Sequence, residues 1–234
     1  MFVICSQPRV GTHMVRTSLN THPSLDVASE VFNGLVNEQE MEQHSTHQLL
    51  AKYPGGFCCH CYDEDETVGM WPCWELAQDL WEMIRRGAVQ DVKAVVLWRE
   101  DKIAQAISYL KASMVGPWHR MKTDPPLDEC QTSIDVPPWM LRALFEKFEA
   151  ATAFQIEVMD GANVERLRIS YEQLTESPDH HLHNIQKLFG VQPRPLVPQT
   201  TKINRHPIPA QVSNWGDLVR SFRGTKWGHY FDRY

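Results

Sequence analysis

The chain has 234 residues, of which 42% are hydrophobic and 22% charged. This balance allows a sizeable buried core and excludes global disorder, and the length suits a single domain. The formal net charge of −6 argues against general nucleic-acid binding.

The N-terminal segment combines a short apolar run with a helical pattern. Residues 2–5 are apolar and predict a buried strand. After it, the apolar spacing predicts a helix that starts at Gly11 or Thr12 and ends before Pro23. A strand, a tight loop and a helix N-terminus in this order direct unpaired backbone N–H groups at one spot, so the sequence predicts an anion site there. Arg9 adds a guanidinium fork to that site.

This loop differs from the phosphate loop of most nucleotide triphosphatases, which reads G-x-x-x-x-G-K-[ST]. Here Gly11 is followed by Thr12 and His13, and no glycine stands five residues before Gly11. We therefore expect Arg9 to supply the positive charge that a lysine supplies elsewhere. A nucleotide kinase with a degenerate loop is an alternative, but it would need a lysine and a magnesium carboxylate where this chain has neither.

The segment after the first helix contains a candidate carboxylate near the predicted anion site. Residues 23–32 form a loop that returns towards the strand ends, and Glu30 lies within it. A carboxylate is unexpected beside a site that only binds anions, but it is expected where a general base is needed. The alternative is a solvated surface residue.

The rest of the chain alternates between strand and helix patterns. Residues 94–98 are continuously apolar, as is typical of parallel strands covered on both faces. The alternation implies an α/β fold with a doubly wound parallel sheet flanked by helices and right-handed crossovers. Further strands are predicted at 55–62 and 164–169, and helices at 74–86, 102–114, 137–160, 177–189 and 214–222.

A second anion-binding position is predicted where the strand at 94–98 ends. Arg99 follows this strand directly, and Asp101 is a suitable N-cap for the next helix. Ligands bind at the carboxyl edge of open α/β sheets, so Arg99 and Ser108 together are candidates to hold a second phosphate.

The cysteines do not form a convincing metal site. Cys58, Cys59, His60 and Cys61 stand next to one another on a predicted strand, where successive side chains face opposite ways. The chain lacks the paired ligand unit that a structural zinc site requires. We expect buried thiols and no metal.

Three stretches together resemble the 3′-phosphoadenosine-5′-phosphosulfate (PAPS)-dependent sulfotransferases. Residues 6–13 are similar to that family's 5′-phosphosulfate loop, and residues 99–108 to its 3′-phosphate site. Tyr171-Glu-Gln-Leu174 is similar to the Tyr-Glu-Asp-Leu segment of the family. Asp101 to Ser108, followed by Gly-Pro-Trp-His at 116–119, most resembles the trehalose 2-sulfotransferase branch.

The resemblance implies a single sulfotransferase-like domain over residues 1–234 with a P-loop-like 5′-phosphosulfate loop. It implies PAPS as donor, 3′,5′-ADP as product, no metal, and an acceptor hydroxyl on a carbohydrate or small molecule. Glu30 would be the catalytic base and Arg9 would stabilise the leaving group. Residues 115–136 would form an acceptor-side loop, and 191–234 an extension over the cofactor side. Cofactor-binding residues would be Arg9, Val10, Gly11, Thr12, His13, Met14, Arg99, Ser108 and Tyr171.

Two positions depart from the family pattern. Val10 stands where a serine is usual, and His13 where a small hydroxyl residue is common. Backbone N–H groups survive such changes, so donor binding should persist. A further alternative is a non-catalytic relative that binds 3′,5′-ADP. In a catalytic chain, His13 is a candidate to assist the reaction. Arg223 is an additional candidate for the 3′-phosphate.

The sequence also carries expectations about location and partners. The first predicted strand begins at residue 2, which leaves no room for a signal peptide, and no apolar run approaches the length of a membrane span. We therefore expect a cytoplasmic chain with reduced cysteines, no membrane span and no nucleic-acid partner. The oligomeric state is left open.

Overall fold

The fold contains a parallel sheet flanked by helices, as the sequence predicts. The computed structural model describes residues 2–28, 48, 57–60, 80, 82–114, 116–118, 120–124, 133–161, 164–201 and 206–234. Within these residues, one sheet has the strand order β2-β1-β3-β4, with every neighbouring pair parallel. The strands are β1 (Phe2–Ser6), β2 (Phe57–His60), β3 (Lys93–Trp98) and β4 (Glu165–Ser170).

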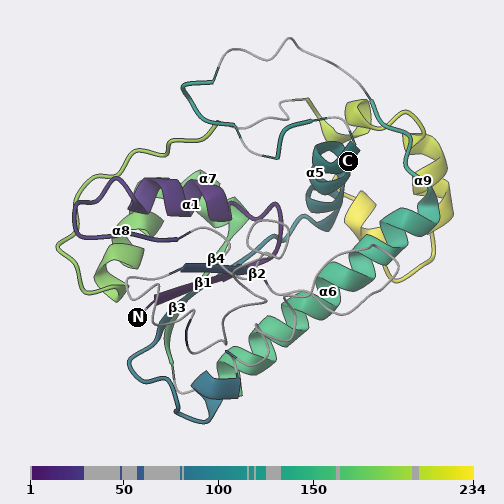
Figure 1. Cartoon of the computed structure of the whole chain (residues 1–234). Coiled ribbons are helices and arrows are strands. Elements are labelled where there is room, and N and C mark those ends of the chain that lie inside the picture. The colour runs from purple at the N-terminus through teal and green to yellow at the C-terminus, as the bar shows by residue number, and fades with distance from the viewer. Residues whose placement is uncertain are drawn as a thin grey trace.

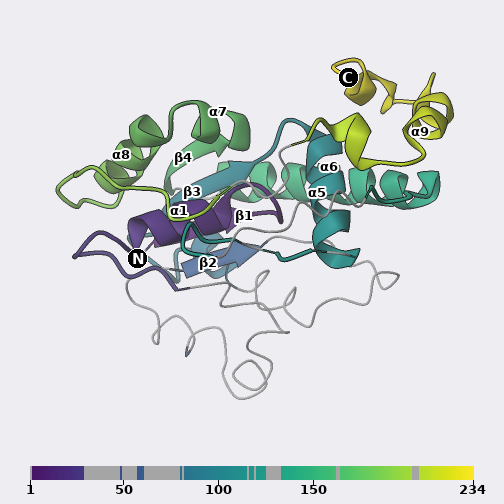
Figure 2. The ribbon, with the colours of Figure 1, turned by 90° about the horizontal axis from the view of Figure 1, so that it is seen from above.

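Helices cover both faces of this sheet (Figures 1 and 2). α1, α7 and α8 lie on one face, α6 runs across the other, and α5 stands beyond the carboxyl ends of the strands. This arrangement confirms the predicted doubly wound α/β fold. The helices are α1 (Thr12–Leu19), α5 (Lys102–Met114), α6 (Pro138–Gly161), α7 (Tyr171–Glu176), α8 (Pro178–Leu188) and α9 (Trp215–Phe222), with short 3₁₀ turns η2 (Ile208–Gln211) and η3 (Gly228–Phe231).

The first core is aliphatic and lies between the sheet and α1, α7 and α8. It forms because the apolar residues of β1 and β3 that face this side meet the apolar stripes of three helices. We call it the aliphatic core; its buried members include Ile4, Val10, Val15, Leu19, Val95, Leu97, Ile169, Leu174, Leu182, Ile185 and Leu188.

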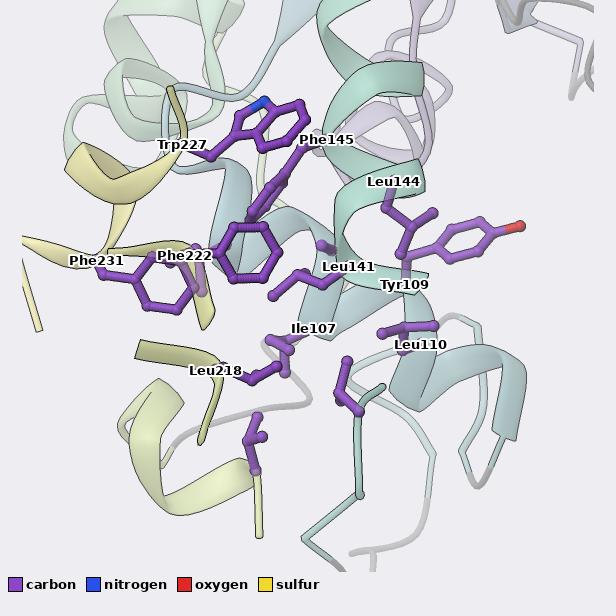
Figure 3. Close-up of a cluster of buried hydrophobic side chains, with 14 of the residues drawn as sticks. Ile107, Tyr109, Leu110, Leu141, Leu144, Phe145, Leu218, Phe222, Trp227 and Phe231 are labelled. Carbon is purple, nitrogen blue, oxygen red and sulfur yellow. The ribbon is translucent and has the colours of Figure 1, made fainter. Parts of the chain in front are cut away.

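The second core is rich in aromatic rings and joins α5 and α6 to the C-terminal segment (Figure 3). Phe145 of α6 lies at its centre, with ring centroids 5.6 Å from Phe222 and 5.1 Å from Tyr230. We call it the aromatic core; its buried members include Ile103, Ile107, Leu110, Leu141, Leu144, Phe145, Phe148, Leu218, Phe222, Trp227 and Phe231.

Among the described α-helices, α7 was not predicted. Ser170 ends β4 and immediately starts α7: its hydroxyl accepts from the N–H of Gln173 at 3.2 Å, and the Gln173 side chain accepts from the N–H of Ser170 at 3.0 Å. This reciprocal capping box lets a helix begin without any intervening loop. Because α7 starts at the sheet edge, it carries Tyr171 and Glu172 directly to the carboxyl ends of the strands.

The segment that follows α5 pairs with the extended residues after α8. Met121 and Thr200 form an antiparallel bridge, the N–H of Lys122 donates to Gln199 O at 2.8 Å, and the N–H of Thr201 donates to Arg120 O at 3.1 Å. Two regions far apart in sequence therefore support one another beside α5. In the part of the chain that the structure describes, none of the helices is both long and apolar enough to span a bilayer.

Candidate active site

The loop between β1 and α1 has an unusual backbone. Arg9 has a φ of 65° and Gly11 a φ of 90°, both in the left-handed region that side chains disfavour. A Cβ at Gly11 would also lie 3.1 Å from Leu174 Cδ2 and 3.2 Å from Tyr171 Cδ2. Glycine at this position therefore serves both the turn and the close approach of the loop to α7.

The side chain of Arg9 is held from two directions. Its Nε donates to Ser108 Oγ on α5 at 2.9 Å, and its Nη1 donates to the carbonyl oxygen of Trp118. Burial lowers the pKa of Arg9, and the nearby charge of Arg99 lowers it further. The loop thus presents a well-oriented, partly desolvated guanidinium group beside the N-terminus of α1.

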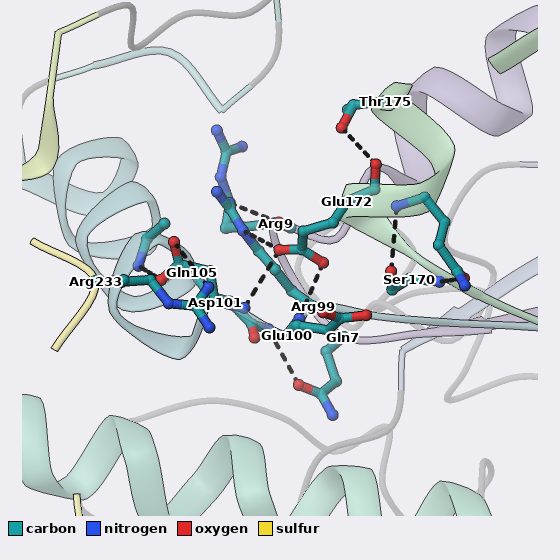
Figure 4. A network of polar contacts seen from close by, with 12 residues as sticks. Gln7, Arg9, Arg99, Glu100, Asp101, Gln105, Ser170, Glu172, Thr175 and Arg233 are labelled. Atoms are coloured by element: carbon teal, nitrogen blue, oxygen red, sulfur yellow. Dashed lines mark hydrogen bonds and ion pairs between the residues drawn. The ribbon is translucent and has the colours of Figure 1, made fainter. Parts of the chain in front are cut away.

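Arg99 lies next to the same loop and brings α7 into the site (Figure 4). Its Nη1 donates to the carbonyl oxygen of Arg9 at 3.3 Å, and its guanidinium lies over the Tyr171 ring at 4.4 Å from the centroid. Its Nε is 3.8 Å from a carboxylate oxygen of Glu172. Two arginines and an aromatic ring from three separate elements therefore converge at the carboxyl edge of the sheet.

Carboxylates already occupy the N-terminus of α5. Asp101 Oδ1 accepts from the N–H of Ala104 at 2.9 Å, which confirms the predicted N-cap. The N–H groups of Glu100 and Asp101 donate to the Glu172 carboxylate at 3.0 and 3.3 Å. A phosphate near Arg99 would therefore have to be held by side chains rather than by these backbone donors.

Asp101 also contacts the C-terminal residues. Tyr234 donates its hydroxyl to Asp101 Oδ2, and Arg233 Nη1 lies 3.7 Å from the same oxygen. Burial raises the pKa of Tyr234, and the hydrogen bond to Asp101 raises it further. The C-terminal segment thus reaches the α5 end of the site.

Two polar atoms at the site are buried without a hydrogen-bond partner. They are Oγ1 of Thr12, in the first turn of α1, and Nε of Arg99. A buried polar group that is left unpaired is costly, and native structures usually provide a partner for it. Both atoms can donate to phosphate oxygens, so the residues present fit an anionic, nucleotide-like ligand.

Comparison with known proteins identifies the family. The Stf0 sulphotransferase family model matches residues 75–221, which is more than half of the chain. The chain belongs to the Stf0 sulphotransferase family. This confirms the resemblance to PAPS-dependent sulfotransferases and to their trehalose 2-sulfotransferase branch, and it makes sulfuryl transfer the reaction class of the protein.

Two relatives and one solved structure are similar over nearly the whole chain. Nodulation protein H of Rhizobium tropici is 23% identical over 99% of this chain and 92% of its own length. Nodulation protein H of Rhizobium meliloti (strain 1021) is 23% identical over 99% of this chain and 94% of its own. A crystal structure of a sulfotransferase from Alicyclobacillus acidocaldarius shares the fold with a TM-score of 0.52 and 14% identity, covering 94% of this chain and 88% of that one.

The structure explains one departure from the family pattern. The side chain of Val10 is fully buried in the aliphatic core, so only its backbone remains to face a ligand. Met14 packs against the same core. His13 is half-buried, and its Nδ1 lies 3.5 Å from Nη2 of Arg16.

Some predicted residues are not joined to this cluster. Glu30 lies outside the residues that the structure describes, and so do residues 115, 119 and 125–132 of the predicted acceptor-side loop at 115–136. Arg223 is exposed at the end of α9, and no contact within the described residues joins it to Arg9 or Arg99. Among the described side chains, no group of three His, Cys, Asp or Glu residues is arranged to hold a metal ion.

A buried polar network that the sequence did not predict lies beneath the loop. Gln7, Gln105 and Gln155 are each at most 1% exposed, and Lys102 is 7% exposed. Gln7 Nε2 donates to Thr152 Oγ1 at 2.7 Å, and Lys102 Nζ donates to the same oxygen at 3.3 Å. The sequence did carry a signal for this network, because Lys102 and Gln105 are polar residues among the apolar residues of α5. Burial lowers the pKa of Lys102 to about 8.

Proposed function

We propose that this Stf0 sulphotransferase uses PAPS as its sulfuryl donor and a hydroxyl group of a carbohydrate or another small molecule as its acceptor. The observation that carries the proposal is the convergence of Arg9, Arg99 and Tyr171 beside the N-terminus of α1. Guanidinium groups and a helix N-terminus suit the phosphate groups of a nucleotide, and an aromatic ring suits its base. The family resemblance assigns the 3′-phosphate to Arg99 and Ser108 and the adenine to the neighbourhood of Tyr171.

The chemistry sets a clear task for the loop. The acceptor oxygen forms a bond to sulfur while the bond between sulfur and the bridging oxygen breaks, and the electron pair stays on the 5′-phosphate of 3′,5′-ADP. Negative charge therefore develops on the bridging oxygen. Arg9 and the N–H groups of residues 11–14 would stabilise that charge in the manner of an oxyanion hole.

A hydroxyl group is a weak nucleophile, so a base has to accept its proton. Glu30 is the proposed base because it follows α1 in the loop where the family carries a glutamate. A positioned general base contributes roughly 10²–10⁴-fold to the rate. This role is distinct from that of Arg9, which acts on the leaving group.

The acceptor is proposed to bind on the side of residues 115–136. Trp118 is 40% exposed. Its carbonyl oxygen accepts a hydrogen bond from Arg9, and its ring lies edge-on to the Tyr109 ring at 5.5 Å between centroids. An exposed aromatic ring next to the proposed sulfuryl position is a suitable surface for a sugar. The contacts of Arg233 and Tyr234 with Asp101 support a C-terminal segment that borders the donor side.

The proposal is tested with radiolabelled PAPS and a panel of sugars and small alcohols that includes trehalose. We expect label to move to a carbohydrate in the wild-type reaction. Glu30→Gln should lower turnover roughly 10²–10⁴-fold and leave the Kd for 3′,5′-ADP unchanged. Normal turnover of this variant would remove Glu30 from the mechanism.

A second candidate is a family member that binds 3′,5′-ADP but transfers nothing. The buried side chain of Val10 favours it, because a hydroxyl that the family usually offers to the donor is missing. Binding of 3′,5′-ADP without transfer to any acceptor, in a preparation that is fully folded, would support this alternative.

A further inference from the structure

We infer that Gln105 is a positioning residue that holds Arg9 in its functional orientation. The inference rests on the donor proposed above and adds a residue whose role is not to touch that donor. Gln105 lies on α5, is 0% exposed, and faces the loop rather than the aromatic core that its neighbours Ile103 and Ala106 join.

Arg9 has a backbone conformation that needs support from its surroundings. Its φ of 65° is disfavoured for any residue with a side chain, so the surrounding structure has to hold it there. The value of φ depends on the orientation of the peptide between Pro8 and Arg9, and Gln105 Nε2 donates to the carbonyl oxygen of that peptide at 3.0 Å. The next peptide is held by Arg99, whose Nη1 donates to Arg9 O at 3.3 Å. Both peptides that flank the Arg9 Cα are therefore fixed by side chains from the β3–α5 segment.

The guanidinium group of Arg9 is held by the same helix. Ser108 accepts from Arg9 Nε at 2.9 Å, and it stands one helical turn after Gln105 on the same face of α5. The same face of one helix thus holds the backbone of Arg9 through Gln105 and its side chain through Ser108. Movement of α5 or loss of the Gln105 amide would change where the guanidinium points.

Gln105 is itself held by hydrogen bonds. Its Nε2 also donates to Gln7 Oε1 at 3.0 Å, and Gln7 Nε2 donates to Phe148 O at 3.2 Å and Thr152 Oγ1 at 2.7 Å on α6. Both amide protons of Gln105 are therefore used, which defines the orientation of its amide. The loop, α5 and α6 are connected through this buried chain of amides.

The inference predicts that Gln105 acts on the donor only through Arg9. A double-mutant cycle measures such dependence directly. Gln105→Met keeps the length and burial of the side chain but removes both donors. Its effect on the Kd for 3′,5′-ADP is measured by titration calorimetry, in the wild-type background and in Arg9→Ala.

Gln186 provides a matched control. It is 1% exposed on α8, and its Nε2 also makes two donor contacts, in this case to the backbone carbonyls of Leu182 and Arg194 at 3.2 and 3.0 Å. Its Oε1 accepts from the N–H of Arg194 at 3.0 Å. Gln186→Met therefore removes the same number of donor contacts at a place remote from Arg9. It should lower the midpoint of thermal unfolding but leave the Kd for 3′,5′-ADP unchanged.

We expect Gln105→Met to weaken 3′,5′-ADP binding by about tenfold in the wild-type background and by less than about twofold in Arg9→Ala. Equal losses in both backgrounds, or no loss in either, would overturn the inference. If Gln105→Met does not fold, Gln105→Asn replaces it, because the shorter amide cannot reach Pro8 O. A wild-type chain that does not bind 3′,5′-ADP would instead overturn the donor proposal, together with any role for Gln105 in it.

Discussion

The two buried cores of this protein differ in composition and in what they support. The aliphatic core fills one face of the sheet and anchors α1, α7 and the loop between β1 and α1. The aromatic core holds α5 and α6 to the C-terminal segment. The proposed site lies where elements of both meet, because Arg9 comes from the loop and Ser108 comes from α5. Neither core therefore positions the site alone.

The connection between the two regions is polar rather than apolar. Gln7, Lys102, Gln105 and Thr152 join the end of β1 to α5 and α6 through buried hydrogen bonds. Such contacts are directional, whereas apolar packing alone tolerates small shifts. A polar connection therefore suits a site in which two arginines from different elements have to keep a fixed separation.

The largest expected change in stability is in the aromatic core. Phe145→Ala should lower the free energy of unfolding by roughly 3–5 kcal/mol. Leu19→Ala in the aliphatic core should cost about 1 kcal/mol less, because Phe145 also loses edge-to-face contacts with Phe222 and Tyr230. Urea denaturation of both variants tests the comparison. An equal or larger loss for Leu19→Ala would show that the rings add nothing beyond their buried area.

The next effect concerns the buried lysine in the polar connection. The pKa of Lys102 is lowered by burial from 10.5 to about 8, so the folded chain binds fewer protons than the unfolded chain between these values. Stability associated with Lys102 therefore rises with pH across that window, and the full cost of the buried charge is present at pH 7. Lys102→Met should stabilise the protein at pH 7 by up to roughly 3 kcal/mol.

The advantage of Lys102→Met over the wild type should shrink as the pH approaches 10.5. Urea denaturation of both proteins at several pH values between 7 and 10 measures this difference, and the other titrating groups cancel between the two. A difference that stays constant with pH would mean that Lys102 keeps its ordinary proton affinity in the folded chain.

The smallest effect concerns the boundary between the aliphatic core and the loop. Val10→Ser restores the residue that is usual in the family, but the side chain at this position is fully buried among apolar groups. We expect a loss of roughly 1–3 kcal/mol in stability and no increase in sulfuryl transfer. Thermal unfolding and a transfer assay with PAPS test both parts. A rise in transfer would mean that residue 10 faces the donor and that the aliphatic core does not include it.

Much of the fold could be predicted because its signals are local. Continuous apolar runs identified β1 and β3, and helical periodicity identified α1, α6 and α8, each within a few residues of its observed bounds. α7 was missed although Ser170 and Gln173 carry the capping-box spacing, because six residues are too few to show a helical period. The aromatic core draws on residues 103–231, and no local pattern pairs Phe145 with Phe222.

The site could be predicted only in part. Arg9, Arg99 and Tyr171 follow strand ends, and the rule for parallel sheets places such residues at one edge. The contacts that orient them could not be predicted, since Gln105 and Gln7 are 98 positions apart and Glu172 reaches a helix 71 positions earlier. Long-range polar pairs leave no periodic trace in one sequence. The role of Glu30 remains a prediction from the sequence.

The proposed function requires Arg9 and Arg99 to hold the two phosphate groups of the PAPS nucleotide. A thermal-shift titration with 3′,5′-ADP, 5′-ADP and Mg·ATP tests it most directly, on the wild type and on Arg99→Ala. At about 100 times Kd, 3′,5′-ADP should raise the unfolding midpoint of the wild type by roughly 5–10 °C, and the shift should disappear in Arg99→Ala. A shift with Mg·ATP alone, or no shift with any of the three ligands, would contradict the account.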